Sequence, residues 1–167
     1  GTRRPWDFGV PVGGIGTGSF DLLPDGRFAN FTLPDGRGNP IKDMPGTFLS
    51  ISAKAISGGG EARILRARIP VQRGGIFSDR RLVPSVTYRG NYPFASLRFD
   101  TPTFPVRVVA TGYSPFVPGN LFDSSLPAAI VEVEVENPNR FAVSVGVAFS
   151  WQDINSVSPS SQGDMLV

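Results

Sequence analysis

Large apolar residues occupy every second position of residues 141–151, and only Ala, Ser and Gly lie between them. The large residues are Phe141, Val143, Val145, Val147, Phe149 and Trp151. A period of two sustained over this length indicates a β-strand with one buried face. Residues 128–136 alternate in the same way, with valines opposite glutamates, and the turn 137–140 joins the two predicted strands.

The same period recurs along the rest of the chain, between turn signals rich in Gly and Pro. It predicts strands at 15–23, 27–33, 47–56, 61–69, 85–89, 94–100, 105–113, 128–136 and 141–151. Pro24-Asp25-Gly26 is typical of a hairpin turn between the first two strands. No window carries the i, i+3, i+4 apolar stripe of a helix. We therefore predict an all-β fold with little helix, namely a two-sheet antiparallel β-sandwich of about nine or ten strands. A closed barrel is the less favoured alternative.

The chain of 167 residues is long enough to bury a core of its own, and we expect a single domain over 1–167. It begins without Met and ends on an apolar Met-Leu-Val run, so we expect it to be one domain of a longer protein. The weakest order is expected at 35–44 and 154–163, where Gly, Ser and Asn accumulate.

Several classes of function are excluded by the residues that the chain lacks. Neither Cys nor His is present, which removes disulfides, thiolate sites, His-based triads and His-ligated metals. We accordingly predict no cofactor and no metal site. No apolar run reaches membrane-spanning length and no signal peptide is recognisable, so a soluble domain without a transmembrane segment is expected.

The formal net charge is only +2, but 14 of the 16 basic residues are Arg. Six arginines lie between Arg63 and Arg81, where the acidic residues are Glu61 and Asp79. An anionic partner such as a phosphate or lipid headgroup is one interpretation. We favour a solvated strand face or Arg–carboxylate pairs with a neighbouring domain. Because no aromatic stacking platform is interleaved here, we predict no nucleic-acid partner.

Two loops hold the candidate site residues. Residues 13–18 are rich in glycine, but a dinucleotide-binding fingerprint fails because position 19 is Ser19 and a hairpin follows in place of a helix. The glycines instead let backbone approach backbone, or a ligand. Between Pro118 and Pro127, short polar residues form either a self-capped connection or an arm toward a neighbouring domain or substrate cleft. The candidates are Gly13, Gly14, Ile15, Gly16, Asp123, Ser124 and Ser125.

Two further sets of side chains suggest sugar chemistry. Glu132 and Glu134 could be a carboxylate pair, but residues i and i+2 of a strand point in parallel, whereas glycoside cleavage needs acids that flank the bond. They also alternate with valines as a solvent face does, and one catalytic acid would have to be desolvated. We therefore predict no catalytic residue in this chain. Aromatic residues could form a sugar platform, with core filling favoured for Trp151. They are Trp6, Tyr88, Tyr92, Phe94 and Trp151.

Four ordered blocks cover nearly the whole chain. They are GVPVGGIGTGSFDLLPDGRF (9–28), YRGNYPFASLRFD (88–100), FPVRVVATGYSPFVPGN (104–120) and DSSLPAAIVEVEVENPN through FSW (123–151). Together they resemble the N-terminal domain of glycoside hydrolase family 116, the family of the non-lysosomal glucosylceramidase and related bacterial β-glycosidases. The glycine-rich block alone is a weak signal, but the ordered set is specific.

The resemblance implies a β-sandwich that precedes an α-helical (α/α)6 barrel, in which a Glu nucleophile and an Asp acid/base cleave β-glycosides with retention. Neither catalytic residue has a counterpart on this chain. The expected function is thus the N-terminal domain of a β-glucosidase- or glucosylceramidase-like enzyme, inactive alone. It would brace the barrel of the same polypeptide, lend a loop to the cleft, and meet a β-linked glycoside or glycolipid only through that barrel.

Two alternatives stay open at this point. One is a stand-alone carbohydrate-binding module, and the other is a purely structural sandwich with no enzyme partner. A docking role makes a structural prediction of its own, because one surface of the isolated domain should then expose an apolar or Arg-rich patch.

Overall fold

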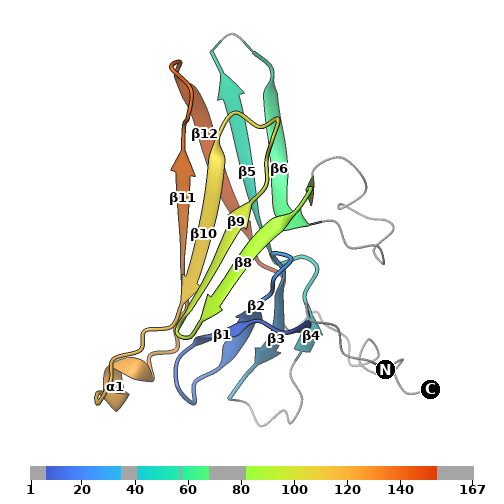
Figure 1. The fold of residues 1–167 in the computed structure, drawn as a ribbon. Coiled ribbons are helices and arrows are strands. Elements are labelled where there is room, and N and C mark those ends of the chain that lie inside the picture. Colours follow the sequence, from blue (N-terminus) through green and yellow to red (C-terminus); the bar gives the residue numbers. More distant parts are fainter. Residues whose placement is uncertain (1–6, 35–40, 57, 68–81, 154–167) are drawn as a thin grey trace, which may run out of the picture.

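The computed structural model describes residues 7–34, 41–56, 58–67 and 82–153. Within them the chain forms twelve strands and one short helix, so the predicted all-β fold with little helix is confirmed (Figure 1). The elements are β1 (Val10–Gly13), β2 (Ser19–Leu22), β3 (Phe28–Thr32), β4 (Ile41–Asp43), β5 (Phe48–Ala55), β6 (Gly60–Ala67), β7 (Leu82–Val83), β8 (Val86–Asn91), β9 (Phe94–Phe99), β10 (Arg107–Tyr113), α1 (Leu121–Ser124), β11 (Ile130–Glu136) and β12 (Val143–Ser150). No helix among these residues has the length and apolar character that a membrane span requires.

Two four-stranded sheets lie face to face as a sandwich (Figure 1). One has the order β11-β10-β9-β8 and the other the order β12-β5-β6-β7, and all their pairs are antiparallel except β6–β7. Their central strands alternate as the sequence predicts, because every second residue points into the layer between the sheets. The buried residues of these strands include Leu49, Ile51, Ala53, Ala95, Leu97, Phe99, Val108 and Ala110.

A third four-stranded sheet, β1-β2-β3-β4, lies at one end of the sandwich and adds to the two sheets that the sequence predicts (Figure 1). It arises because residues 10–22 fold into two short strands around a glycine-rich turn, where the sequence analysis expects one strand from residue 15. Its apolar residues join the same core, and the Phe20 ring lies 5.4 Å from the rings of both Phe28 and Phe31.

The hairpin turn at Pro24-Asp25-Gly26 packs against β6 and ties this third sheet to the sandwich. The backbone N–H of Ala67 donates to the carbonyl of Asp25 at 2.8 Å. Gly26 has φ +88°, and a Cβ at this position would overlap the carbonyl oxygen of Leu65. The turn therefore requires glycine for its conformation and for its contact.

Beside the same turn, Arg66 is only 3% exposed, so the predicted solvated face is wrong at this residue. Burial lowers the pKa of its guanidinium, while the carboxylates of Asp43 and Asp25 favour the charged form. Asp25 also accepts a 2.7 Å hydrogen bond from Nε of Arg27. Elsewhere in this Arg-rich segment Arg63 pairs with Glu61, and residues 68–81 lie outside the described residues.

The alternating strand at the end of the chain differs from its predicted environment. β11 and β12 follow one another in sequence but do not pair, since each is the terminal strand of a different sheet. The predicted apolar face of β12 is half-exposed, not buried, along Val145, Val147, Phe149 and Trp151. At the edge of its sheet, this face has too little of the opposing sheet above it to be covered. The residues of β11 keep the predicted polarity, with valines partly buried and glutamates exposed.

Parts of two further expectations concern residues outside the described ranges. Residues 35–40 and 154–163, where weak order is expected, and Trp6 are among them. Residues 41–44 depart from the expectation of weak order, because 41–43 form β4 and the side chain of Met44 is buried in the core.

We predict that Gly26→Ala lowers the free energy of unfolding by about 3 kcal/mol, because it adds both a strained positive φ and an overlap with β6. Gly16→Ala is the matched control: Gly16 also has a positive φ, +72°, but a Cβ there would meet no atom within 4 Å. It should lose only about 1 kcal/mol. Urea unfolding of both variants measures the difference, and equal losses would show that the turn does not depend on its contact with β6.

Candidate docking site

The two predicted loops contact each other at one end of the molecule. The backbone N–H of Ile15 donates to the carbonyl of Ser124 at 2.8 Å, and the N–H of Gly13 donates to Oγ of Ser114 at 3.1 Å. Gly14 lies so close to the second loop that a Cβ would overlap the carbonyl oxygen of Leu126. Glycine at this position thus permits backbone to pack against backbone, as the sequence predicts.

The second loop is held by its own polar residues. Asn120 caps the short helix α1, and its Oδ1 accepts from the N–H of Asp123 at 3.1 Å. The Oγ of Ser124 accepts from the N–H of Val117 at 2.9 Å and donates to the carbonyl of the same residue at 3.0 Å. Ser124 is only 3% exposed, so these bonds satisfy a buried hydroxyl and fix the loop internally.

The outer side of these loops is apolar. Phe122 is 80% exposed and Leu121 is 68% exposed, on the four-residue helix α1. Four neighbours in the two loops or directly before the second one add exposed apolar surface, and the Phe116 ring also lies 5.7 Å from that of Tyr92. We call this surface the apolar tip: Ile15, Phe116, Val117, Leu121, Phe122 and Leu126. A rigid backbone thus presents large hydrophobic side chains to water, which is typical of an interaction site.

The candidate residues therefore form the support of this surface. Ser124 and Gly14 are buried at the contact, while Gly13, Asp123 and Ser125 are partly buried and Ile15 and Gly16 are exposed. The hydrogen bonds of Ser124, Ser125 and Asp123 go to the loop itself or to the Gly13–Gly16 segment. Sequence reasoning missed Leu121 and Phe122, although two adjacent large apolar residues within a polar loop are a signal that could have identified them.

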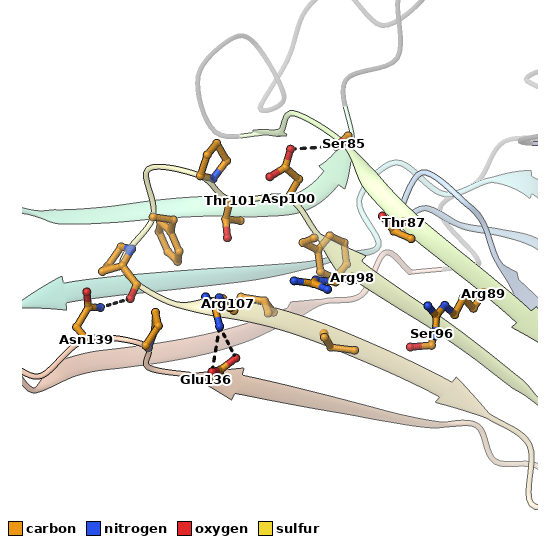
Figure 2. A pocket seen from close by; sticks show the side chains of 17 residues that line it. Ser85, Thr87, Arg89, Ser96, Arg98, Asp100, Thr101, Arg107, Glu136 and Asn139 are labelled. Atoms are coloured by element: carbon orange, nitrogen blue, oxygen red, sulfur yellow. Dashed lines mark hydrogen bonds and ion pairs between the residues drawn. The ribbon is translucent and has the colours of Figure 1, made fainter.

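A second candidate is a shallow depression of about 980 Å³ on the outer face of the β8–β11 sheet. Figure 2 shows Arg89, Arg98 and Arg107 on this face, together with the hydroxyl groups of Ser85, Thr87 and Ser96. Nη1 of Arg107 lies 3.1 and 3.3 Å from the two carboxylate oxygens of Glu136, and both side chains are well exposed. Such an exposed pair contributes little energy. The other carboxylate that lines the depression, Asp100, accepts a 3.1 Å hydrogen bond from Oγ of Ser85.

The acidic residues of β11 lie on its exposed face. Glu132 and Glu134 lie two residues apart on the exposed face of β11. They pair in register with Thr111 and Val109 of β10. Their side chains point in parallel into water, whereas a catalytic pair would have to flank the scissile bond. Among the described residues there is no cluster of three acidic side chains that could hold a metal ion.

The aromatic candidates separate into three environments. Tyr88 faces the core and accepts the N–H of Val10 at its hydroxyl, 2.8 Å away, and burial raises the pKa of this hydroxyl. Tyr92 and Phe94 are half-exposed, and the Phe94 ring lies 5.6 Å from that of Tyr113. Trp151 is half-exposed at the sandwich edge, so core filling is only partly realised.

One family model matches residues 9–165, nearly the whole chain, and its description is beta-glucosidase 2, glycosyl-hydrolase family 116 N-term. No curated protein was found to match the chain. The family match agrees with the resemblance carried by the four sequence blocks.

The two neighbouring serines of the second loop provide a test of its construction. We predict that Ser124→Ala lowers the free energy of unfolding by about 1–3 kcal/mol, because it leaves backbone groups of Val117 without their partner. Ser125→Ala removes one bond from the more exposed hydroxyl to the carbonyl of Phe122, and it should cost less than about 1 kcal/mol. Chemical unfolding of the two variants measures the order, and the reverse order would contradict the loop structure.

Proposed function

The chain belongs to the N-terminal family of glycosyl-hydrolase family 116, and from this premise we propose that it supports the catalytic domain of a retaining β-glycosidase. In this proposal the sandwich braces the helical catalytic domain of the same polypeptide and carries no step of the reaction itself. The substrate class is a β-linked glucoside or glucosylceramide-like glycolipid, which is bound and cleaved in the other domain.

The apolar tip is the observation that carries this proposal. Its loops are fixed by a buried serine and by close backbone contacts, so the side chains above them are held in place before any partner arrives. An exposed phenylalanine on a rigid loop gains free energy when a partner covers it, at about 25 cal/mol per Å² of apolar surface. Because little ordering entropy remains to be lost, such a surface is suited to hold one domain firmly against another.

The chemistry also favours a supporting role. Cleavage with retention needs two carboxyl groups about 5 Å apart, on either side of the scissile bond, with one of them desolvated. The exposed glutamates of β11 meet neither condition. In the proposal the nucleophile and the acid/base belong to the helical domain, as the family resemblance implies, and the tip lies at the junction between the domains, where its loops can reach the rim of the cleft.

A carbohydrate-binding module is the second candidate, and one feature favours it. The half-exposed rings of Tyr92 and Phe94 lie at the tip end of the β8–β11 sheet, each in contact with another aromatic ring. Arg89 and Ser96 follow on the same outer face and could bond to sugar hydroxyls. We favour docking because Leu121 and Phe122 of the tip, at 68% and 80%, are more exposed than Tyr92 and Phe94, at 50% and 49%.

We predict that the 167-residue chain shows no hydrolysis of an aryl β-glucoside, whereas the polypeptide that includes the helical domain does. Release of the chromogenic phenol measures both. Turnover by the isolated chain that is lost in Glu132→Gln or Glu134→Gln would overturn the supporting role. Titration of the chain with cello-oligosaccharides is the companion measurement, because a saturable change in Trp fluorescence would favour the binding module.

A charge placed on the apolar tip tests docking in the intact enzyme. Phe122→Asp should weaken the domain contact by about 2 kcal/mol or more and lower both the thermal midpoint and the hydrolysis rate, because a carboxylate would be desolvated at the junction.

Ile56→Asp is the matched control, since Ile56 is equally exposed at 80% and follows β5, whose hairpin with β6 lies at the end opposite α1 (Figure 1). It should change neither quantity. Equal effects of the two substitutions would contradict docking through the tip.

A further inference from the structure

β12 differs from the other terminal strands of the three sheets. Five of the six are short, contain proline or carry charge: β1 contains Pro11, β4 and β7 have three and two residues, β8 carries Arg89 and β11 carries three glutamates. β12 has eight residues, with no charged residue and no proline. Natural sheets protect an open edge by charge, proline or short length, because its unpaired N–H and C=O groups recruit other strands.

The large apolar side chains of β12 lie at an edge of the core that is only partly covered. In the register with β5, Val145 pairs with Ala53, Val147 with Ile51 and Phe149 with Leu49. All three partners on β5 are at most 5% exposed, yet Val147 on β12 is 47% exposed. Paired residues share one face of a sheet, so the apolar layer is covered over β5 and uncovered over β12.

This uncovered face is continuous with the core. The Phe149 ring lies 5.4 Å from that of the buried Phe28, and the Trp151 ring lies 5.5 Å from that of Phe31. In the opposite sheet, the inward valines of β11 are only partly buried. Among the described residues, both terminal strands therefore lack a further strand on the same side of the sandwich, which Figure 1 shows as the side formed by β11 and β12.

We infer that β12 is an acceptor edge, to which the remainder of the same polypeptide adds a further β-strand with apolar residues at alternate positions. A strand is required because alternate N–H and C=O groups of β12 turn away from β5, and a helix cannot supply a ladder of partners for them. The alternating side chains of the added strand would cover the half-exposed face. The inference rests on the proposed function, since it needs a longer enzyme chain.

A second copy of this chain fits the edge less well. A two-fold pair of β12 strands would bring the neighbouring β11 edges of the two copies toward each other. Each of these edges carries Glu132, Glu134 and Glu136, all exposed. Like charges facing each other across an interface oppose association, whereas a single added strand does not bring a second β11 to this edge.

Hydrogen–deuterium exchange of the intact enzyme, at a concentration where light scattering shows a monomer, tests the inference. The amides of β12 that point away from β5 should exchange within about tenfold of the amides of the central strand β5. Exchange more than about tenfold faster than β5 would overturn strand addition. Protection that appears only when the enzyme dimerises would overturn it as well, because it assigns the edge to a second copy.

Two lysine variants make the test specific to one face of β12. Val147→Lys places a charge in the apolar layer and should abolish the protection of the β12 amides, whereas Ala148→Lys, on the opposite and exposed face, should preserve it. Equal loss in both would contradict the inference. The result is independent of the tip. An effect of Phe122→Asp without protection of β12 contradicts strand addition alone. Protection of β12 without an effect of Phe122→Asp contradicts docking through the tip alone.

Discussion

The contact between the Asp25–Gly26 turn and β6 positions much of the rest of the structure. It holds the third sheet against the sandwich at one point, where Arg66 is buried beside Asp25 and Asp43. The carboxylates of Asp43 and Asp25 favour the charged form of this buried guanidinium, so the turn and β6 are joined by charge as well as by packing. From this anchor the third sheet extends to β1, which packs against β9 and β10. The loop that follows β1 is thereby brought to Ser124.

The sequence predicts most of the strands and the inward residues of the central ones, because the pleat of a strand is a local property. It does not predict which sheet a strand joins. β11 and β12 follow one another through a short turn, as partners in a hairpin do, yet each pairs with a different neighbour. The exposure of Val147 depends on how far the opposite sheet covers β12, and the alternating pattern of β12 carries no information about this. Arg66 is a similar case, because its burial follows from the docking of a distant turn.

The sequence predicts the loops that support the apolar tip, but not the exposed apolar side chains that form it. The close approach of Gly14 and the capping by Asn120 and Ser124 follow from residue types that favour tight turns and local hydrogen bonds. That the two loops meet is a tertiary fact, which the third sheet brings about. The exposure of Leu121 and Phe122 is tertiary too, because a polar loop with two apolar residues normally turns them toward the core.

The apolar tip and the β12 edge are both uncovered, but they need different partners for a physical reason. At the tip, backbone groups such as the N–H of Ile15 and the N–H of Val117 have partners within the loops, so apolar side chains are the main surface to be covered and the apolar faces of helices are suitable. At β12 the backbone itself is unpaired along one edge among the described residues, so only another strand satisfies it. An enzyme that joins a sandwich to a helical domain has both kinds of partner to offer. In the proposed enzyme, the tip would meet the helical part of the polypeptide and the β12 edge would meet an added strand.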